Sequence, residues 1–384
     1  MDITTHLDAS TLFMVNAVSL SVFAVTYIFA WAGHSNRIYW ANLTLSNVLF
    51  AIAFIMFSRL IDASNTDLLA PNCLLVIGLC LRWQAVRAFF GHAPSFILPA
   101  ILTALVFLLL SLEKEIGTSF VFGGVNVAIA LQIFVIIYTL VSERKQRLPS
   151  RWGLVAAYGI ILLSSILRAS QGWMLEQGMN SLLPADAFLH IHLFSAAIHI
   201  VASGAFSLSM AYEQGAIELR QVALRDALTG LPNRLGLDHK LNNSFRAGLS
   251  GCAVFIIDID HFKRINDSYG HMTGDRVIRH CGEVISGKLR GQDFAARIGG
   301  EEFLAIIART SPDEAAQIAE RIRQAVENDY IQAGATKVHF TVSVGIAYTD
   351  SLDFSFPDMM AQADRQLYKA KEAGRNRVYA TICA

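Results

Sequence analysis

Residues 299–303 read Gly-Gly-Glu-Glu-Phe and join two apolar segments, 294–298 before them and 303–307 after them. Two glycines between strand-like segments are typical of a hairpin turn, because glycine adopts a positive φ at little cost. We therefore expect a β-hairpin whose turn presents two adjacent carboxylates, which could meet a metal ion or a triphosphate. An ordinary charged hairpin fits these five residues equally well, so the surrounding motifs must decide.

A second apolar run, residues 252–259, ends in Asp258 and is followed by Asp260. A buried strand that ends in carboxylates places them at the edge of a sheet, and Mg²⁺ is commonly held by few carboxylates together with substrate phosphates. Asp260 lies two residues further on, on the same side if the strand continues. It could be a ligand or could accept backbone hydrogen bonds, so the expected metal site does not include it.

Polar side chains follow this strand. Lys263 offers positive charge to a phosphate, and Asn266 and Asp275 offer an amide and a carboxylate that could hydrogen-bond a purine edge. A polar loop followed by a capped helix is the alternative interpretation of the same residues.

The carboxyl half has the sequence pattern of an α/β domain. Helical patterns at 274–288, 312–328 and 357–373 alternate with strand-like runs at 252–259, 303–308 and 340–348. We expect a mixed sheet flanked by helices over residues 226–384, which is an ordinary domain length.

Five motifs occur in order through this half: DALTGLPNR at 226–234, DIDHFKRINDSYGHMTGD at 258–275, RIGGEEF at 297–303, SVGIA at 343–347 and AKEAGRNRV at 370–378. Together they resemble the GGDEF family of diguanylate cyclases, which have a nucleotidyl-cyclase-like α/β fold. The resemblance implies condensation of two GTP molecules into cyclic di-GMP with release of two pyrophosphates. Glu301 stands where the family name has Asp, and it keeps a carboxylate with longer reach.

The resemblance also implies a metal site. Asp258, Glu301 and the backbone carbonyl of Ile259 would hold two Mg²⁺ ions, with Mn²⁺ possible, which would neutralise the triphosphate and lower the pKa of the attacking 3′-hydroxyl. Glu301 is then also the candidate general base. Lys263 would stabilise charge as the α-phosphate is attacked.

Other motif residues would bind the substrate. The family match assigns Asn266 and Asp275 to the guanine edge, with His271 in the same substrate-contacting stretch. Lys371 and Arg375 would hold the phosphates, although an exposed helix face would show the same two cations. Gly299 and Gly300 would let the turn approach the nucleotide closely.

Arg290-Gly291-Gln292-Asp293 matches the RxxD motif, which in this family forms an inhibitory site for the product cyclic di-GMP. Arg290 can grip a phosphate or stack on guanine, and Asp293 can accept from a guanine edge. A chance pair of surface charges is the alternative.

The amino half is different in composition. The chain as a whole is 54% apolar and 16% charged, but most charges follow residue 210, and a formal net charge of zero predicts no nucleic-acid partner. Within a membrane domain at 1–212, surrounded by membrane lipid, we expect about seven transmembrane helices. They fall at 10–32, 38–58, 68–90, 94–112, 118–142, 152–174 and 187–212.

Basic residues in short loops favour the cytoplasmic side. An amino terminus outside places one set of basic residues in the cytoplasm: Arg37, Arg82, Arg87, Arg144, Lys145, Arg147 and Arg151. We expect an integral inner (cytoplasmic) membrane protein of a bacterium with a cytoplasmic catalytic domain. Residues 68–90 fit least well, because Arg82 and Arg87 lie in the last turns of that helix.

His190, His192 and His199 lie in the seventh apolar segment, and ionisable groups within a membrane are candidate functional residues. His192 and His199 are seven residues apart and share a helix face. They could bind a haem or a metal ion, or they could make interhelical hydrogen bonds.

Residues 213–225 continue the helical pattern and are expected to form a helical linker. One half-site holds one GTP, so we expect a homodimer whose alignment is regulated from the membrane domain. A catalytically silent cyclic di-GMP receptor is the alternative function, and a transporter with a regulatory tail is a third.

Overall fold

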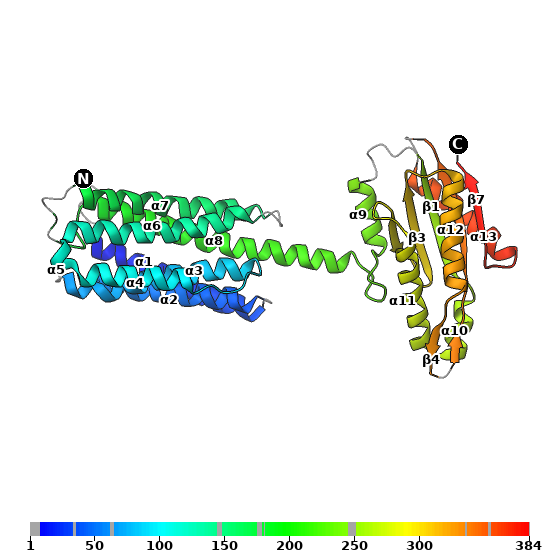
Figure 1. Ribbon diagram of the computed structural model, residues 1–384, viewed down its shortest axis with the longest axis horizontal. Coiled ribbons are helices and arrows are strands. Elements are labelled where there is room, and N and C mark those ends of the chain that lie inside the picture. Colours follow the sequence, from blue (N-terminus) through cyan, green and yellow to red (C-terminus); the bar gives the residue numbers. More distant parts are fainter. Residues whose placement is uncertain are drawn as a thin grey trace. The chain divides into compact units, whose positions relative to one another are not determined.

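The computed structural model (Figure 1) describes residues 8–33, 36–61, 65–143, 148–174, 179, 181–244, 251–334, 336–351 and 355–383. The chain divides into two compact units, Met1–Gly215 and Ala216–Ala384. Arg144, Lys145 and Arg147 of the expected cytoplasmic loop lie outside the described residues.

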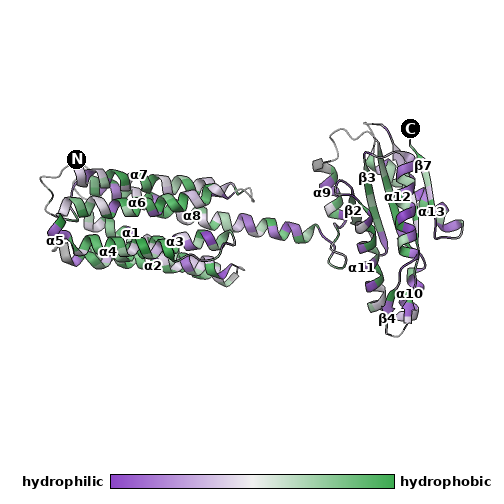
Figure 2. Cartoon of the chain, viewed as in Figure 1, coloured by the Kyte–Doolittle hydropathy of each residue, from purple (hydrophilic) through white to green (hydrophobic). Residues whose placement is uncertain are grey.

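The first unit is a bundle of helices. The helices are α1 (Ala9–Gly33), α2 (Arg37–Arg59), α3 (Leu69–Phe89), α4 (Ile97–Ser111), α5 (Glu113–Ile116), α6 (Thr118–Ser142), α7 (Ser150–Met174) and α8 (Ala187–Ala223), with a 3₁₀ turn η2 (Asn65–Leu68) before α3. Apolar residues cover most of their surfaces (Figure 2), as expected of helices that face lipid.

Six of these helices are long and apolar enough to cross a membrane: α1, α2, α3, α6, α7 and α8. The helix expected at 94–112 is present as α4, but its 15 residues make it shorter than the other six. At 1.5 Å per residue it is about 22 Å long. The 68–90 segment, which fitted least well, is confirmed as the long apolar helix α3.

The second unit is a sheet flanked by helices. The strands are β1 (Cys252–Ile259), β2 (Phe294–Arg297), β3 (Glu302–Ala308), β6 (Val342–Thr349) and β7 (Val378–Ile382), in the order β2-β3-β1-β6-β7, and β4 (Ile331–Ala333) pairs with β5 (Thr336–Val338) in a separate ribbon. Only β6 and β7 are parallel among the pairs of the five-stranded sheet. The expected mixed sheet is therefore confirmed.

Helices cover both faces of this sheet. The helices of the unit are α9 (Arg234–Ser244), α10 (Phe262–Tyr269), α11 (His271–Lys288), α12 (Pro312–Glu327) and α13 (Phe356–Glu372). Alternate residues of β1 belong to two different cores: Phe255 packs with α11 and α12, and Ile256 packs with α9 and α13. This alternation follows from the two-residue period of a strand.

Local sequence explains where the helices begin. Ser311 accepts a hydrogen bond from the backbone N–H of Glu314 and is followed by a proline, which is a strong start for α12. Ser355 caps α13 in the same way. Residues 262–269 form the helix α10, so the interpretation of this stretch as a polar loop is wrong. Gly270, with φ of +80°, separates α10 from α11.

Candidate active site

The expected hairpin forms between β2 and β3, and residues 298–301 make its turn. Ile298 donates its backbone N–H to the carbonyl of Glu302 at 3.0 Å. The expectation of a positive φ at the glycine pair is wrong, because neither glycine has one. A Cβ on Gly299 would lie 2.6 Å from the Glu302 carboxylate, whereas Gly300 has open space around it. Gly299 is thus required by the close approach of the Glu302 side chain and not by a positive φ.

The strand order brings Asp258 to this turn. Asp258 is paired with Glu302 in the β1–β3 ladder, and the backbone N–H of Ile259 donates to the carbonyl of Glu301 at 3.3 Å. Two stretches that are more than 40 residues apart in the chain therefore meet at one end of the sheet. Asp258 lies at the end of β1, and Glu301 lies in the turn directly before the adjacent strand β3, as the metal-site hypothesis requires.

Asp258 has an unusual electrostatic environment. Its side chain is buried, and burial raises its pKa to about 6. The Lys371 ammonium, whose Nζ lies 2.8 Å from Oδ2, opposes this rise, whereas the carboxylates of Glu301 and Glu302 add to it. A cluster of carboxylates with this mutual repulsion fits a hard cation, which would favour their charged forms. In the described part of the chain no group of three or more His, Cys, Asp or Glu has metal-binding geometry, so substrate phosphates would have to complete the coordination.

Asn266 lies on α10 with its side chain directed at α11. Its Oδ1 is buried and has no hydrogen-bond partner, and a Cβ on Gly274 would lie only 1.9 Å from it. A buried amide oxygen without a partner is costly, and a donor from a ligand would satisfy it. This agrees with the proposed contact of Asn266 with guanine. His271 and Asp275 are exposed on the first turns of α11.

The cations expected at the phosphates have different surroundings. Lys263 is exposed on the first turn of α10, and Lys371 near the end of α13 is paired with Asp258. Arg375 follows α13 with φ of +63°, a left-handed conformation that costs energy for a residue with a Cβ.

Asp260 holds this left-handed segment in place. Its carboxylate accepts hydrogen bonds from the hydroxyls of Thr341 and Ser343, both at 2.7 Å, and from the backbone N–H of Asn376 at 3.0 Å. Of the two roles considered for Asp260, the structure supports the acceptor role.

Asp226 and Arg297 were missed as functional residues by the sequence reasoning. The Arg297 guanidinium donates to both Asp226 carboxylate oxygens at 3.0 Å and also to the carbonyls of Gly299 and Gly300. Burial would raise the pKa of Asp226, but hydrogen bonds from Thr229 and Arg297 outweigh it and hold that pKa below its usual value. The pair clamps the turn that bears Glu301. In the sequence, the one available signal was that Arg297 is a charged residue near the end of the otherwise apolar strand 294–298.

The RxxD residues lie together but are occupied by protein groups. Asp293 accepts from the backbone N–H of Arg290 at 2.9 Å, and the Arg290 guanidinium is 2.7 Å from the Glu314 carboxylate. Both members of that ion pair are substantially exposed, so a bound anion could compete with Glu314 for Arg290.

The geometry is that of an α/β domain with an acidic sheet edge, a basic helix end and an unsatisfied buried amide oxygen. Residues 223–377 match the family described as "Diguanylate cyclase, GGDEF domain". This part of the chain is a GGDEF domain, homologous to those of diguanylate cyclases.

Individual relatives agree with this assignment. "Diguanylate cyclase A" of Treponema denticola is 42% identical over 127 residues, which cover 33% of this chain and 34% of that protein. "Diguanylate cyclase DgcP" of Pseudomonas aeruginosa is 39% identical over 162 residues, which cover 41% of this chain and 24% of that protein. Matches to these relatives thus span well under half of their length.

Among solved structures, the coiled coil and GGDEF domain of DgcB from Caulobacter crescentus, in complex with c-di-GMP, is 33% identical. The match covers 46% of this chain and 95% of that chain, with a TM-score of 0.43.

Proposed function

We propose that the protein is a membrane-bound diguanylate cyclase that condenses two GTP molecules into cyclic di-GMP. The observation that carries this proposal is the meeting of Asp258, the Glu301 turn and Lys371 at one end of the sheet. A catalytically silent receptor would have no need of a buried carboxylate and a lysine beside the turn.

The residues of the chain divide the work between binding and chemistry. The unsatisfied Oδ1 of Asn266 accepts from the N1–H or N2 amine of guanine, and Asp275 and His271 complete that side of the site. Lys263 and Arg375 bind phosphate oxygens, and Lys371 remains beside Asp258 or moves to a phosphate when substrate enters. The clamp of Arg297 on the turn keeps Glu301 oriented, and Glu301 accepts the proton of the 3′-hydroxyl.

Asp258, Glu301 and the carbonyl of Ile259 would hold Mg²⁺. When bound, the metal neutralises the triphosphate and makes the 3′-hydroxyl more acidic. Mn²⁺ has the same oxygen preference and is expected to substitute.

Each domain supplies one nucleotide and one set of these groups, so two copies of the chain must face each other. Small misalignments of reacting groups are costly in rate. We propose that the membrane unit controls this alignment through α8, which continues without a break from Ala187 to Ala223.

The membrane unit would place the catalytic unit in the cytoplasm, where GTP is available. Counting α4 as a short seventh crossing keeps the amino terminus outside and matches the basic residues to the inner side. The contacts of α4 with α3 and α6 support this count. A helix this short would be accommodated by local thinning of the bilayer.

The test is incubation of the purified full-length protein with GTP and Mg²⁺, followed by separation of nucleotides by liquid chromatography and mass spectrometry. Cyclic di-GMP and pyrophosphate in a ratio of one to two are expected from GTP, and no cyclic dinucleotide is expected from ATP. Binding of cyclic di-GMP without any synthesis would favour the receptor instead.

A further inference from the structure

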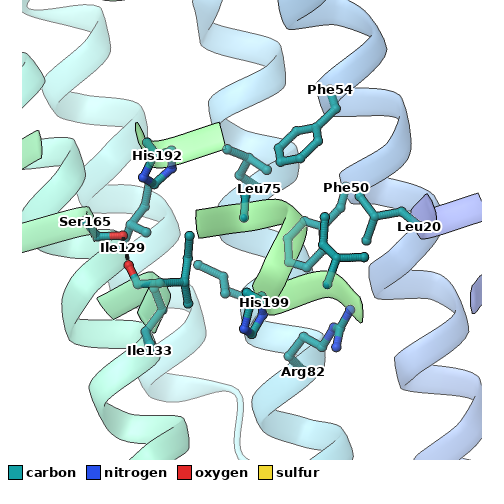
Figure 3. A pocket seen from close by; sticks show the side chains of 14 residues that line it. Leu20, Phe50, Phe54, Leu75, Arg82, Ile129, Ile133, Ser165, His192 and His199 are labelled. Atoms are coloured by element: carbon teal, nitrogen blue, oxygen red, sulfur yellow. Dashed lines mark hydrogen bonds between the residues drawn. The ribbon is translucent and has the colours of Figure 1, made fainter. Parts of the chain in front are cut away.

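The bundle of the first unit contains a chamber with a volume of about 90 Å³. Ten of its 14 lining residues are apolar, and the remaining four are Arg82, Ser165, His192 and His199. Figure 3 shows Arg82 from α3 and the two histidines from α8 at the wall, with apolar side chains such as Phe50 and Leu20 around them. The volume is several times what one ordered water needs.

Arg82 is held rigidly at the chamber wall, with 3% of its surface exposed. Its Nε donates to the Ser46 hydroxyl at 3.0 Å, and its Nη2 donates to the Asn47 side-chain oxygen. Its Nη1 is buried and has no hydrogen-bond partner. Side chains of α2 therefore position the guanidinium, and the Nη1 donors remain unused.

Within the part of the chain that the structure describes, Arg82 has no ion pair with a carboxylate. The sequence has no Asp or Glu in residues 9–61, 68–112, 116–142, 144–175 or 187–212, which include all the long apolar helices of the unit up to Tyr212. The Phe50 ring lies 5.6 Å from the guanidinium carbon, and the Tyr158 hydroxyl oxygen accepts a hydrogen bond from Arg82, but both of these groups are neutral.

Arg168, on α7 of the same bundle, provides the contrast. It is 4% exposed, and its Nη1 lies 3.4 Å from the Asp186 carboxylate and 3.0 Å from the Gln171 oxygen. Among the described residues of the bundle, one buried arginine thus has a carboxylate partner and the other has none. A buried cation without an anion is unfavourable.

The histidines leave the chamber side open. His199 donates its Nδ1–H to the carbonyl of Ala157 at 2.9 Å, and the Nδ1 of His192 lies 2.8 Å from the Ser164 hydroxyl. Both rings therefore bind α7 through Nδ1, as the interhelical interpretation expected. Both histidines also line the chamber.

We infer that this chamber binds the anionic head of an amphiphile, a carboxylate or phosphate with an apolar tail, through Arg82. The head accepts a hydrogen bond from Nη1 of Arg82 and balances the charge of the guanidinium. The tail packs against the apolar residues that line the chamber. Because His192, Ala196 and His199 lie on α8, the bound anion contacts the helix that continues to Ala223. Regulation of cyclic di-GMP synthesis by this anion rests on the proposed function, but binding itself does not.

The probe is isotope-labelled hexanoate, with hexanol and hexylamine as uncharged and cationic controls. Full-length protein in an uncharged detergent is expected to bind hexanoate saturably, near one per chain, and to bind neither control. Arg82→Met should weaken binding by at least about tenfold, because a charge-assisted hydrogen bond is lost. Arg87→Met removes the same charge from the last turn of the same helix, outside the chamber, and should leave binding unchanged.

A second variant covers the case in which Arg82→Met fails to fold. Ala196→Leu fills the chamber and leaves Arg82 in place, so it should also block binding; wild-type affinity in Ala196→Leu would overturn the inference.

Native mass spectrometry separates the two sources of the anion. An anionic phospholipid retained by wild type and Arg87→Met, but lost from Arg82→Met and Ala196→Leu, identifies a lipid head group. The inference is also overturned if neither hexanoate nor an anionic lipid binds, or if Arg82→Met retains the anion. None of these readouts depends on cyclic di-GMP synthesis.

Discussion

Two aspartates at the end of β1, two residues apart, have contrasting surroundings. Asp258 is a desolvated carboxylate with a raised pKa beside one lysine, whereas Asp260 accepts three hydrogen bonds from two hydroxyls and a backbone N–H. The first arrangement is suited to binding a cation, and the second is suited to stability.

Substitution should separate these roles. Asp258→Asn is expected to abolish synthesis without lowering the free energy of unfolding, because it removes a poorly solvated charge. Asp260→Asn should lower the stability of the catalytic unit by about 2–3 kcal/mol, because hydrogen bonds to a buried charge are lost. Denaturant unfolding and product assays on both variants provide the measurement. Equal stability losses would show that Asp258 is also structural.

Arg290 offers a second prediction at this scale. Because Glu314 is paired with Arg290 at 2.7 Å, product must displace it or share the guanidinium. Arg290→Ala is expected to raise the concentration of cyclic di-GMP that gives half-inhibition, and Glu314→Gln is expected to lower it.

Arg321→Ala is the matched control for these variants, since Arg321 is an exposed arginine on α12 bonded to the carbonyl of Lys288. An inhibition curve unchanged in Arg290→Ala and Glu314→Gln would mean that the RxxD residues bind no product.

The β2–β3 hairpin is positioned by a segment from the start of the domain. Asp226 and Arg297 join the DALTGLPNR motif to the carbonyls of the Gly299-Gly300 turn. This ion pair therefore fixes the position of the turn that carries Glu301.

Asp226→Asn should lower the rate of synthesis and reduce stability by about 1–2 kcal/mol, since the ion pair is only partly exposed. The folded-state pKa of Asp226 lies below its usual value, so its contribution is fully present above pH about 4. That contribution is lost as the pH falls through the lowered folded-state pKa. Unfolding free energies of wild type and Asp226→Asn should therefore converge below pH 4. A constant difference across that range would contradict the clamp.

Elements of the catalytic unit were largely predictable from sequence, because their signals are local. The strand 252–259 matches β1 exactly, and Ser311 with the following proline marks the start of α12. The helix α10 was not predicted as one, because its eight residues include a single buried apolar side chain, Ile265. The clamp by Arg297 was also missed, since it depends on a partner 71 residues away.

The membrane unit shows a different limit of sequence reasoning. Hydropathy located the seven apolar helices of the unit but not the short helix α5, and a window of apolar residues cannot distinguish a full span from the 15 residues of α4. Sequence alone could not show that Arg168 pairs with Asp186 while Arg82 pairs with none of the described carboxylates, because both facts depend on how α2, α3 and α7 pack. The structure thus adds the knowledge of which buried charges in the bundle are paired.

At the scale of the whole molecule, the proposed mechanism makes this site half of an active centre. Synthesis should therefore depend on pairing of two chains. Specific activity of the full-length protein in detergent is expected to fall on dilution, and chemical crosslinking should recover it. A specific activity independent of concentration in monodisperse monomers would contradict the dimer requirement.

The central claim is tested most directly by the product that the full-length protein makes in membranes. Membranes containing wild-type protein should convert GTP and Mg²⁺ into cyclic di-GMP, and those containing Glu301→Gln should form at least about a hundredfold less, because loss of a metal ligand and base removes several kcal/mol of transition-state stabilisation. Glu283→Gln, an exposed substitution on α11, should match wild type. Undiminished synthesis by Glu301→Gln, or no synthesis by wild type, would contradict the account.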